Sequence, residues 1–245
     1  MLGWCKGSTL SSLRPGSLRR KEPEPTSSSG GRYLELETWK RKEHFELYRG
    51  FANPFFGVCV ELDVSDLWHR TRAPGGPSFF LASVFSALGA ANAVEAFRAR
   101  IRGDRVWIHD QVAITPTVLR ADQTFAFVRL EPAATYSEFE KRGAPAVREA
   151  CRIKPLEASH PTDDVVYQTT LPWVRFTSFS NALKGADDSV PRVAFGKCSE
   201  DGGRWKLPVS VEVHHAVVDG IDVARFLDEL ERTLHGSWRR ARTRR

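Results

Sequence analysis

Two adjacent histidines followed by an Asp-Gly pair form the segment of this chain with the clearest capacity for chemistry. Residues 209–220 read VSVEVHHAVVDG. Along a strand, alternation places His215 on the face of the three valines and His214 on the opposite face. Apolar surroundings favour a neutral imidazole, which can take a proton from a hydroxyl near neutral pH. The pattern therefore makes His215 a candidate general base, although a lone strand histidine is more often structural.

Asp219 allows two interpretations at this level. It lies four residues after His215 and could orient the imidazole ring. It could equally cap the helix that follows, with Asp222 in the first turn. Adjacent strand histidines cannot easily bind one metal ion, and no third ligand has a fitting spacing, so no metal site is expected.

The elements that must position these residues mix strands and helices. Strands are expected at residues 56–63, 105–108, 112–119, 123–130, 165–170, 174–179, 192–197 and 207–215. Helices are expected at residues 39–49, from 64, at 79–98 after the cap Ser78, and at 136–153 and 221–234. The last helix has apolar residues at helical spacing: Ile221, Ala224, Leu227, Leu230 and Leu234. Without strict strand–helix alternation, the pattern favours an α/β fold, a two-layer sandwich with a mixed β-sheet packed by helices.

Charge separates one folded region from two basic ends. The formal net charge is +6, of which residues 1–32 carry +4 and residues 239–245 carry +5. Residues 33–238 are therefore left with −3. We expect a disordered basic extension at 1–32, one domain at 33–238 and a basic tail at 239–245. Nucleic-acid binding is not expected, because it would need the basic residues on an ordered face.

Cysteine usage and hydropathy favour a cytoplasmic protein without a membrane span. The four cysteines show no metal-ligand spacing and fit a reducing compartment. Residues 73–94 lack charge but contain Pro and Gly, and their helical part is short for a membrane span. The first residues lack the apolar segment of a secretory signal. The Arg- and Ser-rich N-terminal residues fit either an organelle transit peptide or a misplaced translation start, and the sequence does not separate the two.

Further segments, taken with HHAVVDG, resemble the chloramphenicol acetyltransferase family. WKRKEHFE at 39–46 resembles the family's opening helix, PWVRFTSF at 172–179 resembles its PWVxFxSF strand, and AFR at 96–98 resembles the end of its middle helix. The histidine motif also occurs in peptide-synthetase condensation domains, which are longer and lack the opening motif, and in the acyltransferase cores of 2-oxoacid dehydrogenases. The resemblance covers about residues 33–238, in the same order.

The resemblance implies an acetyl-CoA-dependent O-acetyltransferase that acetylates chloramphenicol and confers antibiotic resistance. It implies a homotrimer with active sites between subunits. His215 would be the general base in a ternary complex, without a covalent acyl-enzyme. Arg41 and Asp219 would form a structural salt bridge, which replaces the idea that Asp219 orients the ring. Thr169 would stabilise the oxyanion, although a strand threonine is commonly only a β-former.

Binding roles follow from the same resemblance. Tyr48 and Phe56 would hold the acceptor, Trp173 would lie near the pantetheine of acetyl-CoA, and Lys197 would lie near its 3′-phosphate. Instead of binding coenzyme A, Trp173 could simply pack in the core and Lys197 could simply be an exposed strand residue. No metal cofactor is implied.

Several positions depart from the family's pattern, including Leu47, Ala52 and Pro54 in the pocket lining. Ala194 stands where the family has a threonine that orders water, Thr115 where an aromatic packs on the nitrophenyl ring, and Cys198 where an aromatic lies near adenine. These changes affect the pockets that would bind the substrates, and they leave the candidate base His215 unchanged. They keep open a different acceptor alcohol or amine, and a catalytically inactive binding homologue.

Overall fold

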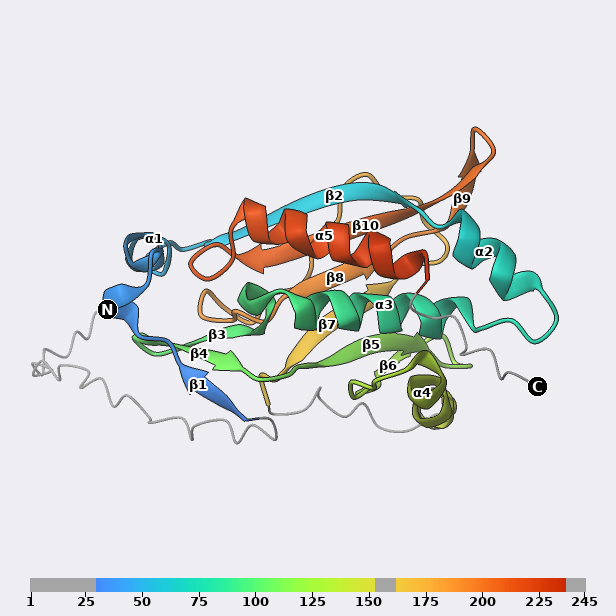
Figure 1. Ribbon diagram of the computed structural model, residues 1–245, viewed down its shortest axis with the longest axis horizontal. Coiled ribbons are helices and arrows are strands. Elements are labelled where there is room, and N and C mark those ends of the chain that lie inside the picture. The colour runs from blue at the N-terminus through green and yellow to red at the C-terminus, as the bar shows by residue number, and fades with distance from the viewer. Residues whose placement is uncertain (1–29, 153–161, 237–245) are drawn as a thin grey trace, which may run out of the picture.

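The computed structural model describes residues 30–152 and 162–236, and Figure 1 shows their arrangement. The strands are β1 Gly31–Tyr33, β2 Phe55–Asp63, β3 Ala99–Arg102, β4 Arg105–His109, β5 Ala113–Leu119, β6 Phe125–Phe127, β7 Val165–Thr170, β8 Arg192–Phe195, β9 Ser199–Asp201 and β10 Arg204–His214. The α-helices are α1 Lys42–Tyr48, α2 Ser65–Arg72, α3 Phe79–Ala93, α4 Tyr136–Ala150 and α5 Gly220–Leu234, with 3-10 turns at Leu36–Thr38 and Glu95–Arg98. Within these described ranges, no helix combines the length and apolarity that a bilayer span requires.

The main sheet is mixed, which confirms the predicted fold class. Its strand order is β2-β10-β8-β7-β5-β6, with β9 paired to the start of β10. Strand β7 runs parallel to both β5 and β8, whereas the other pairs are antiparallel. Helices α3 and α5 cover one face of this sheet (Figure 1), and β1, β4 and β3 form a smaller sheet beside it. The two layers hold the C-terminal end of β10, where the histidine pair lies, at one end of the molecule.

The valine row of β10 packs under the helices as its alternation predicts. Val209, Val211 and Val213 are fully buried and belong to the main core. The opposite, helix-free face of the sheet is crossed by residues 171–191, through bonds such as Ser210 Oγ to the Phe179 carbonyl and the Asn181 side-chain amide to the Glu212 carboxylate. The strand is therefore fixed from both sides.

The buried face of α5 agrees with the expected apolar row in its C-terminal half only. Leu230 and Leu234 are buried, but Ile221 is 59% exposed, and Val223, Phe226 and Thr233 complete the buried face. Both sets of residues have helical spacing, so sequence alone does not choose between them. Phe226 stacks on Phe97 with ring centroids 4.3 Å apart, and this large contact sets the rotation of the helix.

Other expected elements also end or pair differently. The expected strand at 174–179 is irregular, because Pro172 lacks an N–H and Val174 turns back to bond the Leu171 carbonyl. The helix expected at 79–98 has its Ser78 cap but ends at Ala93, since Val94 is extended. Strands β1, β3 and β9 were not expected. The domain boundary expected at residue 33 falls inside β1, while most of the basic extension and the tail lie outside the described residues.

Candidate active site

The ring of His215 lies between two aromatic side chains. Tyr48 from α1 stacks on it with ring centroids 4.0 Å apart and planes at 15°, and Phe56 from β2 packs at 4.6 Å. The His215 N–H donates to the Pro54 carbonyl, which ties the residue after β10 to the start of β2. The side chain is half-buried, and its buried Nδ1 has no hydrogen-bond partner among the described residues. Packing therefore fixes the ring plane, with Nε2 as the nitrogen that can meet a substrate.

Arg41 holds the loop that follows His215. Its Nη2 donates to the His215 carbonyl at 2.9 Å, and its Nη1 lies 2.7 Å from the Asp219 carboxylate. Partial burial opposes ionisation of Asp219, but the Gly220 N–H and the Arg41 charge outweigh it and keep the pKa of this carboxyl below its ordinary value. The ion pair implied by the resemblance is thus present, and Asp219 does not contact the imidazole through any bond in the described structure.

Asp219 also caps α5, as its other interpretation predicted. Its side chain accepts from the Gly220 N–H at 2.7 Å, while Asp222 accepts from the Asp219 N–H at 3.0 Å. Asp222 lies 4.0 Å from Arg41, a third connection that the sequence reading missed. The spacing Asp-x-x-Asp at the start of an apolar helix is a capping-box pattern and indicates the bond of Asp222 to the Asp219 N–H, but the contact with Arg41 has no local signal.

His214 has a structural environment on the opposite face. Its Nε2 bonds the Ala186 carbonyl at 2.8 Å, and its Nδ1 accepts from the Ala216 N–H at 3.1 Å. Burial lowers the pKa of this imidazole below its ordinary value. Both ring nitrogens are occupied, so His214 is an anchor for residues 181–190 and has no free nitrogen for chemistry.

Thr169 lies far from His215 within one chain. It pairs with Ala194 of β8, which in turn pairs with Ser210 of β10. His215 follows five residues after Ser210. At roughly 3.4 Å per residue and two strand spacings of about 4.8 Å, Thr169 and His215 are about 20 Å apart. One chain alone does not bring the candidate base and the candidate oxyanion donor together.

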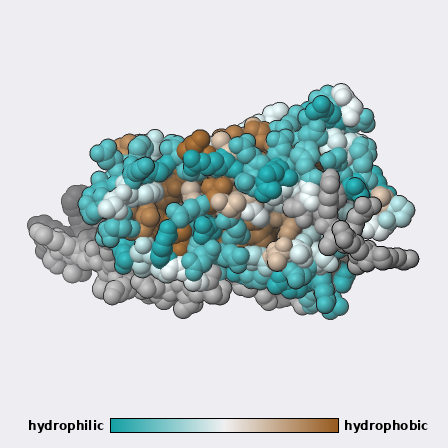
Figure 2. Space-filling model, viewed as in Figure 1, coloured by the Kyte–Doolittle hydropathy of each residue, from teal (hydrophilic) through white to brown (hydrophobic). Residues whose placement is uncertain are grey.

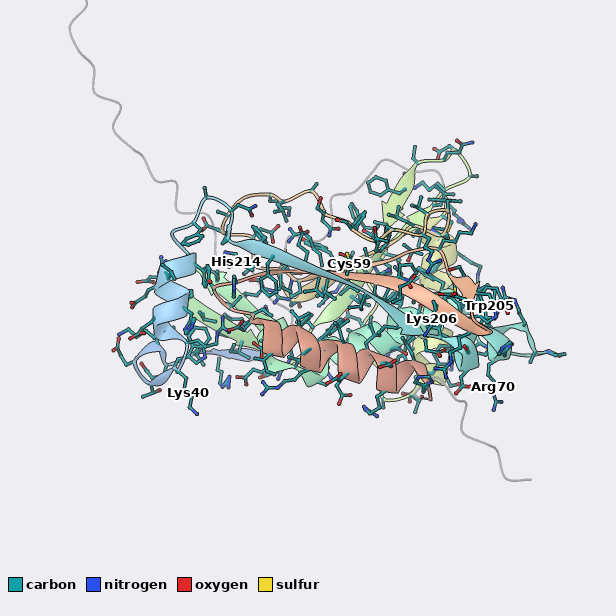
Figure 3. The ribbon with its side chains drawn as sticks, turned by 90° about the horizontal axis from the view of Figure 1, so that it is seen from above. Lys40, Cys59, Arg70, Trp205, Lys206 and His214 are labelled. Atoms are coloured by element: carbon teal, nitrogen blue, oxygen red, sulfur yellow. The ribbon has the colours of Figure 1, made fainter. Side chains whose placement is uncertain are left out.

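The residues implied for coenzyme A lie toward the other end of the sheet. Trp173 is 61% exposed, which excludes core packing as its role, and Lys197 is exposed as well. The Lys197 N–H donates to the Val174 carbonyl at 2.8 Å and so joins the two segments. Burial raises the pKa of Cys198 to about 11, which keeps this thiol protonated. Figure 3 shows Trp205 and Lys206 at this end and His214 at the opposite end.

The two departures beside Thr169 are small buried side chains. Ala194 is directly opposite Thr169, and Thr115 pairs with Tyr167 on the neighbouring strand, so all share the helix-free face. Both Ala194 and Thr115 are buried, and the Thr115 hydroxyl has no hydrogen-bond partner among residues 30–152 and 162–236. No cluster of three or more metal-ligating side chains occurs in the same residues.

The proteins that this chain resembles in sequence and in fold belong to one family. The family model for chloramphenicol acetyltransferase matches residues 32–231. A Campylobacter coli chloramphenicol acetyltransferase is 30% identical over 82% of this chain and 97% of its own length. Chloramphenicol acetyltransferase 2 of Escherichia coli is 32% identical over 81% of this chain and 94% of its own length. A solved chloramphenicol acetyltransferase structure shares the fold, with a TM-score of 0.75 at 24% identity over 84% of this chain and 100% of that one. This chain is therefore an acyltransferase that belongs to the chloramphenicol acetyltransferase family.

Proposed function

We propose that the chain transfers the acetyl group of acetyl-CoA to a hydroxyl of chloramphenicol, with His215 as general base. The observation that carries the proposal is the half-buried imidazole clamped between Tyr48 and Phe56 at the end of β10. Nδ1 is buried, so Nε2 accepts the hydroxyl proton. The hydroxyl oxygen then attacks the thioester carbonyl within one ternary complex.

Thr169 donates its hydroxyl to the oxyanion that forms when the thioester carbonyl is attacked. Such a donor is commonly worth ~10²–10³ in kcat. Collapse of the intermediate releases the coenzyme A thiolate, which takes the proton back from His215. Trp173 and Lys197 hold the pantetheine and the 3′-phosphate, and Tyr48 and Phe56 contact the acceptor.

Each active site is built from two chains of a homotrimer. The separation of about 20 Å between Thr169 and His215 supports this arrangement, since proton transfer and oxyanion stabilisation act at hydrogen-bond distance. The exposed apolar side chains of Trp173 and Val174 on the helix-free side suit a subunit contact. The cell compartment we propose is the cytoplasm, and the physiological role is antibiotic resistance.

A second acceptor is favoured by one observation, the small side chains beside Thr169. Thr115 puts a small side chain with an unpartnered hydroxyl where the family has an aromatic ring, and Ala194 lacks the hydroxyl of the family's threonine. A different alcohol or an amine could be held there and acetylated by the same chemistry.

Thiol release from acetyl-CoA tests the proposal directly. We expect turnover with chloramphenicol that disappears in His215→Ala and persists in His44→Ala, a matched control at an exposed histidine of α1. Turnover with other alcohols or amines but not with chloramphenicol would support the second candidate, in which the acceptor is a different compound. Unchanged turnover in His215→Ala would contradict the base assignment, and a trimer without any transfer would indicate a binding homologue.

A further inference from the structure

A stack of two tryptophans and an arginine lies at the end of the molecule opposite His214 (Figure 3). The indole rings of Trp68 from α2 and Trp205 from β10 lie 3.6 Å apart at their centroids, with planes at 20°. The guanidinium carbon of Arg72 lies 3.2 Å from the Trp68 ring centroid and 5.9 Å from the Trp205 centroid. Trp68 is therefore the middle layer, and nothing in the reaction proposed above uses the stack.

The stack fixes the plane of the Arg72 guanidinium and leaves its outer side open. The backbone N–H of Trp205 donates to Ser65 Oγ at 2.9 Å, and the Val64 N–H donates to the Trp205 carbonyl at 2.8 Å, so α2 is tied to β10. Arg72 is exposed, whereas both indoles are partly buried. A guanidinium that already lies on an aromatic ring loses little freedom when a second planar group stacks on its free face. The site is therefore pre-organised for a planar ligand.

Three cations at this end have no carboxylate partner. Arg70 and Arg72 come from the last turn of α2, and Lys197 follows β8. None of the three forms an ion pair within residues 30–152 and 162–236, whereas Lys206 lies 3.8 Å from the Asp63 carboxylate. Figure 2 shows mostly hydrophilic residues over α2 and β9. Uncompensated cations at an exposed surface attract a multiply charged anion.

The acids near the stack do not reverse this balance. Glu200 on β9 lies opposite Trp205 in the strand register, is exposed and forms no ion pair in the described part of the chain. Asp66 lies in the first turn of α2, away from Arg72, and contacts His235 at 3.6 Å. One free carboxylate against three free cations leaves a net attraction for phosphate.

The stack lies beside the segment assigned above to the 3′-phosphate of acetyl-CoA. The Arg72 charge acts on the Cys198 thiol, where it partly opposes the rise in pKa that burial causes. Cys198 directly follows Lys197, and β9 begins at the next residue and pairs with the start of β10. The Cys198 side chain offers no ring to a base, so Arg72 supplies the flat surface there.

We propose that Arg72 selects the nucleotide end of acetyl-CoA, an inference that rests on the acetyl-CoA binding in the proposed function. The adenine ring stacks on the outer face of the guanidinium, and phosphate groups lie against Arg70 and Lys197. Trp68 and Trp205 do not touch the ligand and act as positioning residues that hold the guanidinium plane. An acyl donor that lacks the adenosine phosphates, such as acetyl-pantetheine, loses all of these contacts.

Calorimetric titration of the full chain with adenosine 3′,5′-bisphosphate tests the inference without a thioester. We expect saturable binding that weakens about tenfold in Arg72→Met, which removes both the charge and the plane. Arg72→Lys keeps the charge alone and should weaken binding about threefold. Arg105→Met is the matched control, because Arg105 is also exposed and lies 3.4 Å from the Tyr33 ring centroid, on the smaller sheet. This control should bind the nucleotide like the unchanged chain.

Steady-state kinetics separates this inference from the proposed function. In Arg72→Met, the KM for acetyl-CoA should rise about tenfold at an unchanged kcat, since Arg72 touches no reacting atom. An unchanged KM, the absence of saturable nucleotide binding, or an equal loss of affinity in Arg105→Met would overturn the inference and leave acetyl transfer standing. Nucleotide binding that depends on Arg72 in a chain without acetyl transfer would support the inference and refute the proposed function. Melting midpoints within ~2 °C of the unchanged chain show that each variant is folded.

Discussion

Replacement of Arg41 by Met tests whether a backbone contact positions the candidate base. The ion pair with Asp219 is partly exposed, with 18% of the Arg41 and 39% of the Asp219 side chain accessible, so after solvent screening it contributes only ~0.5–1 kcal/mol. The charged hydrogen bond to the His215 carbonyl contributes ~1.5 kcal/mol more. Together, a loss of about 2 kcal/mol should lower the unfolding midpoint by ~4–8 °C.

The effect on catalysis should exceed the effect on stability. If the loop loses its anchor and the ring shifts by ~1 Å, kcat should fall ~10²-fold. Asp219→Asn removes the ion pair and keeps both the carbonyl bond and a capping side chain, so its kcat should fall less than about fivefold. Lys40→Met, one residue earlier and exposed as Figure 3 shows, is the control for loss of a cation.

The assay is steady-state thiol release at saturating acetyl-CoA, with thermal unfolding of each variant measured in parallel. Equal losses of kcat in Arg41→Met and Asp219→Asn would refute the reasoning, because they would trace positioning to the ion pair instead of the carbonyl bond. A drop in melting temperature without a loss of kcat would assign Arg41 a purely structural role.

Three other expectations follow from the described contacts. Thr169→Val should lower kcat ~10²–10³-fold in the same assay while Thr169→Ser retains most of it, and equal rates in both variants would exclude the hydroxyl as a donor. Phe226→Ala should cost ~3–5 kcal/mol of unfolding free energy by urea titration, since Phe226 is fully buried against Phe97; a loss below ~1 kcal/mol would contradict that packing. Because burial lowers the pKa of His214 in the folded state, the unfolded chain binds more protons below its ordinary pKa of 6.5, so stability should fall as the pH decreases through 6.5. His214→Asn should flatten that dependence in melting curves recorded between pH 5 and pH 8, and an unchanged slope would assign it to other groups.

Alternation and family motifs predict much of the sheet and the order of the site residues. The valine row of β10 and the opposite orientation of His214 follow from period-two geometry, and the structure confirms both. The capping role of Asp219 follows from local backbone chemistry and is confirmed as well.

Features that depend on contacts between distant segments are the ones that sequence misses. Two overlapping apolar rows of α5 fit the helical period, and the stack of Phe226 on Phe97 turns Phe226 instead of Ile221 toward the core. The hydrogen bond of Arg41 to the His215 carbonyl spans 174 positions and has no local signal. The irregular path of residues 174–179 has a local cause in Pro172, but the bond of the Lys197 N–H to the Val174 carbonyl joins it to a separate segment and has no local signal.

The distance between Thr169 and His215 has a genetic consequence. If each site draws these groups from two different subunits, as we propose, a chain that lacks one group can be rescued by a chain that lacks the other. Coexpressed His215→Ala and Thr169→Val chains would assemble into mixed trimers in which some sites combine an intact imidazole with an intact hydroxyl. Two individually silent alleles would then restore acetylation together, a form of intragenic complementation that a self-sufficient monomer could not display.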